Sequence, residues 1–197
     1  MTITDAMTAR GSVDPSFVNM KTGERLSWPD RHNTLSFDAS KAMAMAFGGD
    51  SSMIPDSIGI IYGSNEWSPS AITRDQTWEA LEKELAVDVA DIQIQQFSYS
   101  PSLKDVKVIG KDGTVKTGTA VVFHAHTNSS TPGKLGTSLN SISAEKTYIL
   151  QAVLLKKLPG DKDSYYVIAR VDLKDEHGYQ QKPADFEVAL DWTVKFF

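Results

Sequence analysis

The chain has no cysteine among its 197 residues, which excludes disulfide bonds and thiolate chemistry. It also has no apolar run that approaches the roughly 18 residues of a transmembrane helix. The first residues lack the charged region and the apolar stretch of a secretion signal. We therefore expect a soluble protein that is made in the cytosol and has no membrane partner.

A concentration of positive charge is missing as well. The 20 Lys and Arg residues are scattered among 25 Asp and Glu residues, and the formal net charge is −5. A basic stripe that neutralises phosphates is not present, so we expect no nucleic-acid partner. With 41% apolar residues, the chain has enough material to bury a substantial core.

Motifs of the commonest enzymatic and nucleotide-binding sites are also lacking. The sequence has no Gly-x-Ser-x-Gly, no Gly-x-x-x-x-Gly-Lys-Ser/Thr and no Gly-x-Gly-x-x-Gly pattern. Glu79, Glu82 and Glu84 crowd one short segment, but their surroundings are typical of a solvated helix face. We predict no catalytic residue, no cofactor and no enzymatic activity.

His124-Ala125-His126 is the one pattern with metal-ligand spacing, because side chains at positions i and i+2 of a strand lie on the same face. A third ligand is not evident nearby, so we predict no metal site. Val121, Phe123 and Ala125 have the character of a core-facing side. The two histidines are then expected on the opposite face, where they are candidates for a subunit interface.

The clearest pattern of the sequence lies in residues 186–197, where large apolar residues alternate with small, polar or charged ones. A period of two is typical of a β-strand with one buried face. We expect the alternate large residues to lie in the core: Phe186, Val188, Leu190, Trp192, Val194 and Phe196.

Strand patterns and turn signals dominate the second half of the chain. They predict strands at 91–99, 106–109, 114–116, 119–127, 146–156 and 164–173. No crossover helix is predicted between these strands. The first half has helical periodicity at 38–47 and 75–86, with a buried strand at 58–62 between them. These elements predict a mainly β fold, an antiparallel β-sandwich with one or two short helices in the N-terminal half.

Residues 1–34 differ from the rest, because Gly, Pro, Asp and Asn punctuate the segment and its large apolar residues follow no period. We predict an extended N-terminal arm over 1–34 and a single sandwich domain over 35–197. Phe17, Leu26 and Trp28 are costly to leave in water, yet they are too few to fold the segment alone. They are predicted to anchor the arm on a neighbouring subunit or on a partner protein.

Seven short segments follow one another in a recognisable order: the Ala-rich helix 39–47, the strand 58–62, the element 78–82, and the strands 121–125, 148–154, 167–170 and 190–196. In this order they resemble segments of bacteriophage virion structural proteins of the tail-fibre, collar or baseplate-associated kind. The resemblance spans roughly residues 35 to 197. It implies a virion structural protein that is made in the host cytoplasm and assembles into a homo-oligomer with neighbouring virion proteins.

Two other functions are compatible with the same sequence. One is a capsid decoration protein. The other is a carbohydrate-binding sandwich that uses Trp28, Trp67 or Tyr99 as a stacking platform. Trp67 lies in a loop-like segment, so a subunit interface is a further expectation for this residue.

Overall fold

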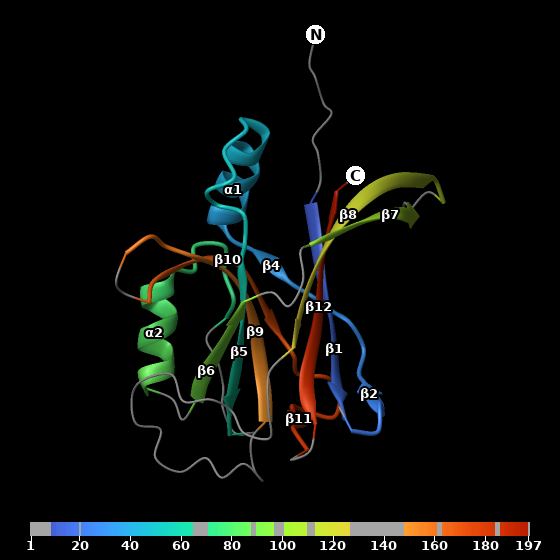
Figure 1. The fold of residues 1–197 in the computed structure, drawn as a ribbon, viewed down its shortest axis with the longest axis vertical. Coiled ribbons are helices and arrows are strands. Elements are labelled where there is room, and N and C mark those ends of the chain that lie inside the picture. The colour runs from blue at the N-terminus through green and yellow to red at the C-terminus, as the bar shows by residue number, and fades with distance from the viewer. Residues whose placement is uncertain are drawn as a thin grey trace.

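The computed structural model describes residues 9–19, 21–64, 71–87, 90–96, 101–109, 113–126, 148–160, 163–183 and 186–196. These described residues fold into two antiparallel β-sheets with two α-helices, and the predicted mainly β sandwich is confirmed (Figure 1). Both helices lie in the N-terminal half. Within the described ranges, neither helix is long and apolar enough to cross a membrane.

Sheet A is built around the last strand of the chain. Its strand order is β2-β1-β12-β8-β7, and β3 also pairs with β1. Its strands are β1 (Ala9–Val18), β2 (Arg25–Ser27), β3 (Arg31–His32), β7 (Ser102–Ile109), β8 (Val115–His126) and β12 (Glu187–Phe196). β7 and β8 pair in the antiparallel direction as a hairpin, and β8 runs unbroken through the two segments 114–116 and 119–127 that the sequence predicts as separate strands.

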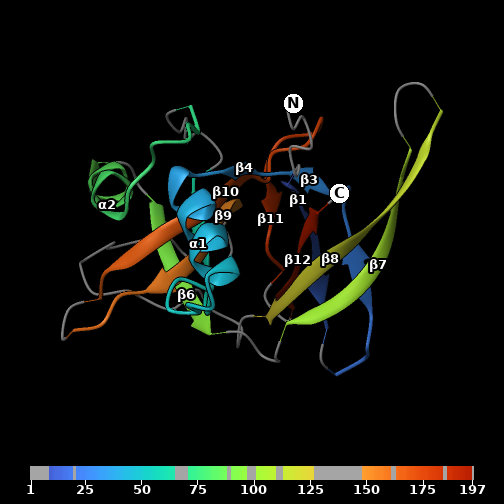
Figure 2. The same ribbon diagram turned by 90° about the horizontal axis from the view of Figure 1, so that it is seen from above.

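Sheet B has the order β4-β10-β9-β5-β6, and β11 also pairs with β9. Its strands are β4 (Thr34–Leu35), β5 (Ser57–Gly63), β6 (Ala90–Gln96), β9 (Tyr148–Lys157), β10 (Tyr165–Asp172) and β11 (Gln180–Gln181). Strands β5 and β9 are buried on both faces, because sheet A covers one face of sheet B and a helix covers the other (Figure 2).

The two helices, α1 (Phe37–Phe47) and α2 (Trp78–Val87), each begin after a hydroxyl cap. The hydroxyls of Ser36 and Thr77 accept hydrogen bonds at 3.2 Å from the N–H groups three residues further on. Thr77 therefore caps α2, which begins three residues after the predicted start at residue 75. Helix α1 covers one end of the sandwich, and α2 packs on the face of sheet B that points away from sheet A (Figures 1 and 2).

The main core lies between the two sheets, and β12 contributes alternate side chains to it. Val188, Leu190 and Trp192 have no exposed surface, and Val194 is 8% exposed. Phe186 and Phe196 are partly buried and pack against the margin of this core. All six side chains thus lie on the side that the alternation predicts.

The N-terminal segment differs from the predicted arm. β1 pairs with β12 over ten residues, from Ala9 opposite Phe196 to Val18 opposite Glu187. Phe17 is buried in the main core, and the ring of Trp28 packs on it with the centroids 4.7 Å apart. Residues 9–19 and 21–35 are therefore part of the sandwich, and a boundary between an arm and a domain does not occur at residue 34.

Pro15 and Gly11 fit this strand for two physical reasons that the sequence pattern concealed. The Pro15 carbonyl accepts a hydrogen bond from the Trp28 N–H, so the backbone groups of Pro15 face away from β12 and its missing N–H disturbs no bond to that strand. Gly11 lies under the side chain of Asn33, where a Cβ atom would collide with the amide. That amide, with its oxygen turned toward Trp192, accepts a hydrogen bond from the buried indole N–H.

A buried ion pair fixes α2 to sheet B. Arg170 Nη1 and Nη2 donate to the two Glu84 carboxylate oxygens at 2.9 and 3.0 Å, and Arg170 Nε donates to Gln151 Oε1 at 2.5 Å. The side chains of Arg170 and Glu84 are only 6% and 12% exposed. The expectation of a solvated Glu84 is wrong, because the helix turns this carboxylate toward the sheet.

The anchors predicted for the arm provide a test of the position of β1. Phe17→Ala should lower the free energy of unfolding by about 3–5 kcal/mol, because it leaves a cavity in the main core. Leu26→Ala, at a position 43% exposed and opposite Phe17 in the register, should change it by about 0.5 kcal/mol or less. Urea unfolding of both variants measures the difference. Equal, small effects would indicate that β1 is detached from the core.

A second test concerns the buried ion pair. Glu84→Ala should cost about 3–5 kcal/mol of stability, because Arg170 is left as a buried charge without its carboxylate. The matched control Glu82→Ala removes an exposed carboxylate of the same helix and should cost about 0.5 kcal/mol or less. Denaturant unfolding separates the two cases, and a loss at Glu82 as large as that at Glu84 would contradict the geometry.

Candidate functional site

The histidines of β8 lie on the outer face of sheet A, which is turned away from sheet B. Phe123 and Ala125 are buried in the main core, so His124 and His126 point to the opposite side, as the sequence predicts. Their side chains are 28% and 37% exposed. The two histidines are therefore accessible members of a polar sheet face.

Three adjacent strands bring Ser102, His124 and Asp191 into one hydrogen-bond chain. His124 of β8 lies directly opposite Asp191 of β12 in the strand register, and its Nδ1 is 2.7 Å from Asp191 Oδ1. The other ring nitrogen, Nε2, is 3.3 Å from the Ser102 hydroxyl of β7. With Nδ1 protonated, His124 donates to the carboxylate and accepts from the hydroxyl.

His126 has a separate acidic partner. Its Nδ1 is 3.3 Å from Glu187 Oε2 at the start of β12. Each histidine thus contacts its own carboxylate, and the two ring Nδ1 atoms are not directed at one shared metal position. Among the described residues, no group of three or more His, Cys, Asp or Glu side chains is arranged to hold a metal.

Further negative charge lies beside this chain. Asp14 of β1 is opposite Asp191 in the register and on the same face. Partial burial raises the pKa of the Asp14 carboxyl, and the charges of Asp30 and Asp191 raise it further, while Lys195 and Lys104 act in the opposite direction. At Asp191 the hydrogen-bond chain therefore ends beside another carboxylate, that of Asp14, on which the charge of Asp30 also acts.

Ser102, His124 and Asp191 contact one another in the order of a nucleophile, a base and an orienting acid. Acyl transfer also needs N–H donors that stabilise an oxyanion. The N–H groups of β8 are used in two strand ladders, whereas β7 pairs only on the side of β8. Contacts between side chains of three neighbouring strands are typical of a cross-strand polar network that fixes strand register.

The inner side of sheet A presents a different surface, an apolar cleft at the end of the sandwich that α1 covers. The cleft has a volume of about 450 Å³, and its lining residues are all apolar. Its walls come from α1, from β8 and β12 of sheet A, and from sheet B; they include Ala42, Met43, Val121, Phe123, Leu154 and Phe196.

The β7–β8 hairpin projects beyond sheet B, and it carries exposed aliphatic side chains on the side of sheet A that also lines the cleft (Figures 1 and 2). Leu103 is opposite Val121, and Ile109 is opposite Val115, so these residues share the inner face of sheet A. Val121 lines the cleft, whereas Leu103, Ile109 and Val115 are 73%, 72% and 60% exposed. We call the exposed side chains of Leu103, Ile109 and Val115 the inner face of the hairpin.

The remaining predicted site residues are not brought together. Phe17 and Trp28 pack on each other near the β1–β2 edge of sheet A, away from β7, and Leu26 is partly exposed on β2. Because Trp28 packs against the main core, it is not an open platform for sugar stacking. Trp67 and Tyr99 lie outside the described residues.

Sequence reasoning missed Ser102, Asp191 and Glu187 as partners of the histidines. A partial signal was present, because Glu187 and Asp191 occupy the polar side of the alternating terminal strand. The pairing itself depends on the register between β8 and β12, which the residue pattern does not specify.

Fold and site together define an antiparallel β-sandwich with a polar outer face on sheet A and an apolar cleft beside α1. Comparison with protein-family models, with curated proteins and with solved structures found no match. Function is therefore argued from the residues and their geometry.

The hydrogen-bond chain has a structural role that can be separated from catalysis. Ser102→Ala should lower stability by roughly 0.5–1.5 kcal/mol, the net contribution of one hydrogen bond. The turnover of an activated ester such as p-nitrophenyl acetate should be the same for the variant and for the unmodified chain. If the unmodified chain hydrolyses the ester and Ser102→Ala abolishes this activity, Ser102 is a nucleophile and the structural role is contradicted.

Proposed function

We propose that the chain is a non-enzymatic structural subunit of a bacteriophage virion, in the tail, the collar or the head–tail region. In this role it binds copies of itself and neighbouring virion proteins, and it is made in the host cytoplasm before incorporation into the particle. The observation that carries the proposal is the apolar surface formed by the apolar cleft and the inner face of the hairpin.

This surface favours a macromolecular partner over water. Full burial of an exposed aliphatic side chain contributes up to about 1.5–3 kcal/mol, and three such side chains share one face of the hairpin. Ile54 at the cleft is also 42% exposed. Exposed aliphatic side chains gathered on one face beside an apolar cleft are typical of protein–protein contacts.

The choice of a virion rests on the sequence resemblance. Its segments correspond to α1, β5, α2, β8, β9, β10 and β12, which supply both helices and the central strands of both sheets. A capsid decoration protein would use the same surface and differ in its place in the particle. Localisation therefore distinguishes the two structural roles.

Purified particles of a phage that encodes this chain provide the first test. Quantitative mass spectrometry should find the chain at a copy number set by the symmetry of the particle, and antibody labelling should place it at the tail or the head–tail region. Labelling over the whole head would support the decoration role instead. Intact, infectious particles that lack the chain would contradict both.

A matched pair of variants links incorporation to the apolar cleft. In a phage whose own copy is deleted, supplied Ile54→Asp should fold but fail to enter particles, because it places a charge in the cleft. The control Ser40→Asp adds the same charge at an exposed position of α1 and should be incorporated like the unmodified chain. Thermal unfolding of both variants checks that they fold.

A further inference from the structure

β7 is a long edge strand without cover. It is the outermost strand of sheet A, and no other strand in the described part of the chain pairs with its outer side. The edge strands β2 and β4 have three and two residues, and α2 contacts β6. β7 has eight residues, and half of its backbone N–H and C=O groups point away from β8. Such an edge is a template for pairing with another chain.

The side chains of β7 make this edge selective. Leu103, Asp105, Lys107 and Ile109 share the inner face of sheet A, and all four are exposed. Along the strand the face therefore reads aliphatic, acidic, basic, aliphatic. In the reverse direction the face reads aliphatic, basic, acidic, aliphatic. Two antiparallel copies of β7 can therefore place aliphatic opposite aliphatic and acidic opposite basic side chains.

We propose that β7 pairs in the antiparallel direction with β7 of a second copy of this chain, about a two-fold axis at Val106. In this register Leu103 lies opposite Ile109 of the second copy, and Asp105 lies opposite Lys107. The two-fold axis repeats each pair, so the contact has two aliphatic pairs and two ion pairs. Opposite-charge and aliphatic cross-strand pairs each contribute to sheet stability.

Charge also excludes the neighbouring symmetric registers. A two-fold axis at residue 105 would place Asp105 opposite its own copy, and an axis at residue 107 would do the same for Lys107. Like charges directly opposite each other destabilise a sheet. On the other face the proposed register places Val106 opposite itself and Lys104 opposite Val108, so no like charges meet there. The charges of β7 thus favour the register at Val106 over both neighbouring symmetric registers.

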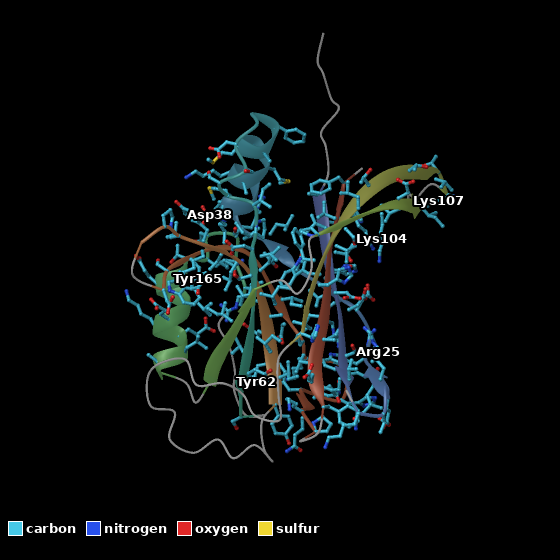
Figure 3. The ribbon with its side chains drawn as sticks, in the orientation of Figure 1. Arg25, Asp38, Tyr62, Lys104, Lys107 and Tyr165 are labelled. Carbon is cyan, nitrogen blue, oxygen red and sulfur yellow. The ribbon has the colours of Figure 1, made fainter. Side chains whose placement is uncertain are left out.

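The pairing would also join the apolar surfaces of the two copies. The inner faces of the two hairpins would become neighbours on one continuous sheet, and Leu103 and Ile109 of each copy would cover each other. Figure 3 shows Lys104 and Lys107 along the projecting hairpin, where a second copy can approach the edge. The biological meaning of this dimer rests on the proposed assembly role.

Charge-reversal variants of the full chain test the register. Sedimentation equilibrium should show a dimer of the unmodified chain. Asp105→Lys turns each ion pair into two opposed lysines, and Lys107→Asp turns each into two opposed aspartates. Each variant alone should therefore dimerise about tenfold more weakly or worse. A mixture of these two variants restores both ion pairs and should recover the dimer mass.

Lys104→Asp is the matched control, because it changes the net charge as much as Lys107→Asp but lies opposite Val108 in the proposed register. Its dimerisation should match that of the unmodified chain. Circular dichroism checks folding, which should persist because the altered side chains are exposed.

A monomeric unmodified chain would overturn the proposal and indicate that the lysines of β7 keep the edge unpaired. A dimer that ignores the charge reversals, or that fails to recover in the mixture, would overturn the register at Val106. These outcomes are independent of particle incorporation. A chain found in particles but monomeric in solution refutes only the β7 dimer, and a β7 dimer that never enters particles refutes only the virion role.

Discussion

The structure depends on β12, which lies between two partner strands and buries one of its faces in the main core. β12 pairs with β1 over ten residues and with β8 over eight, and Trp192 lies opposite Val13 on one side and Phe123 on the other. All three of these side chains are buried in the main core. A slip of one residue would turn the core face of β12 outward, so this burial fixes the register of sheet A.

Fixing that register also fixes two surfaces with different chemistry. The outward side of β12 places Asp191 and Glu187 against the histidines of β8, while the inward side lines the apolar cleft. Because the β7–β8 hairpin projects beyond sheet B, the inward side continues as the exposed aliphatic inner face of the hairpin. One alternating pattern thus produces both the polar network and the surface that we assign to assembly.

Much of this fold follows from the sequence. The alternation in residues 186–197 placed the side chains of β12 correctly, and the helical periods predicted α1 and α2 to within a few residues. β1 was missed because Gly11, Asp14 and Pro15 are typical of turns. The structure places Gly11 where the Asn33 amide needs space and Pro15 where its nitrogen faces away from β12. Both reasons are tertiary, so no local pattern contains them.

The polar partners of the site were harder to predict than the fold. His124 and His126 were placed on the outer face by strand periodicity, but their contacts with Asp191 and Glu187 depend on pairing between strands more than 60 residues apart. Ser102 carries no sequence signal of its own. Glu84 resembled a solvated carboxylate, because the position of Arg170 on β10 is not visible from the helix sequence.

The central claim is that the free edge of sheet A is an assembly surface, and concentration-dependent hydrogen exchange tests it most directly. The backbone amides of residues 102–109 that point away from β8 should exchange slowly at high protein concentration and rapidly on dilution, while amides of the central strand β12 should exchange slowly at both. Exchange of those outward-pointing amides that is rapid and independent of concentration would contradict the account.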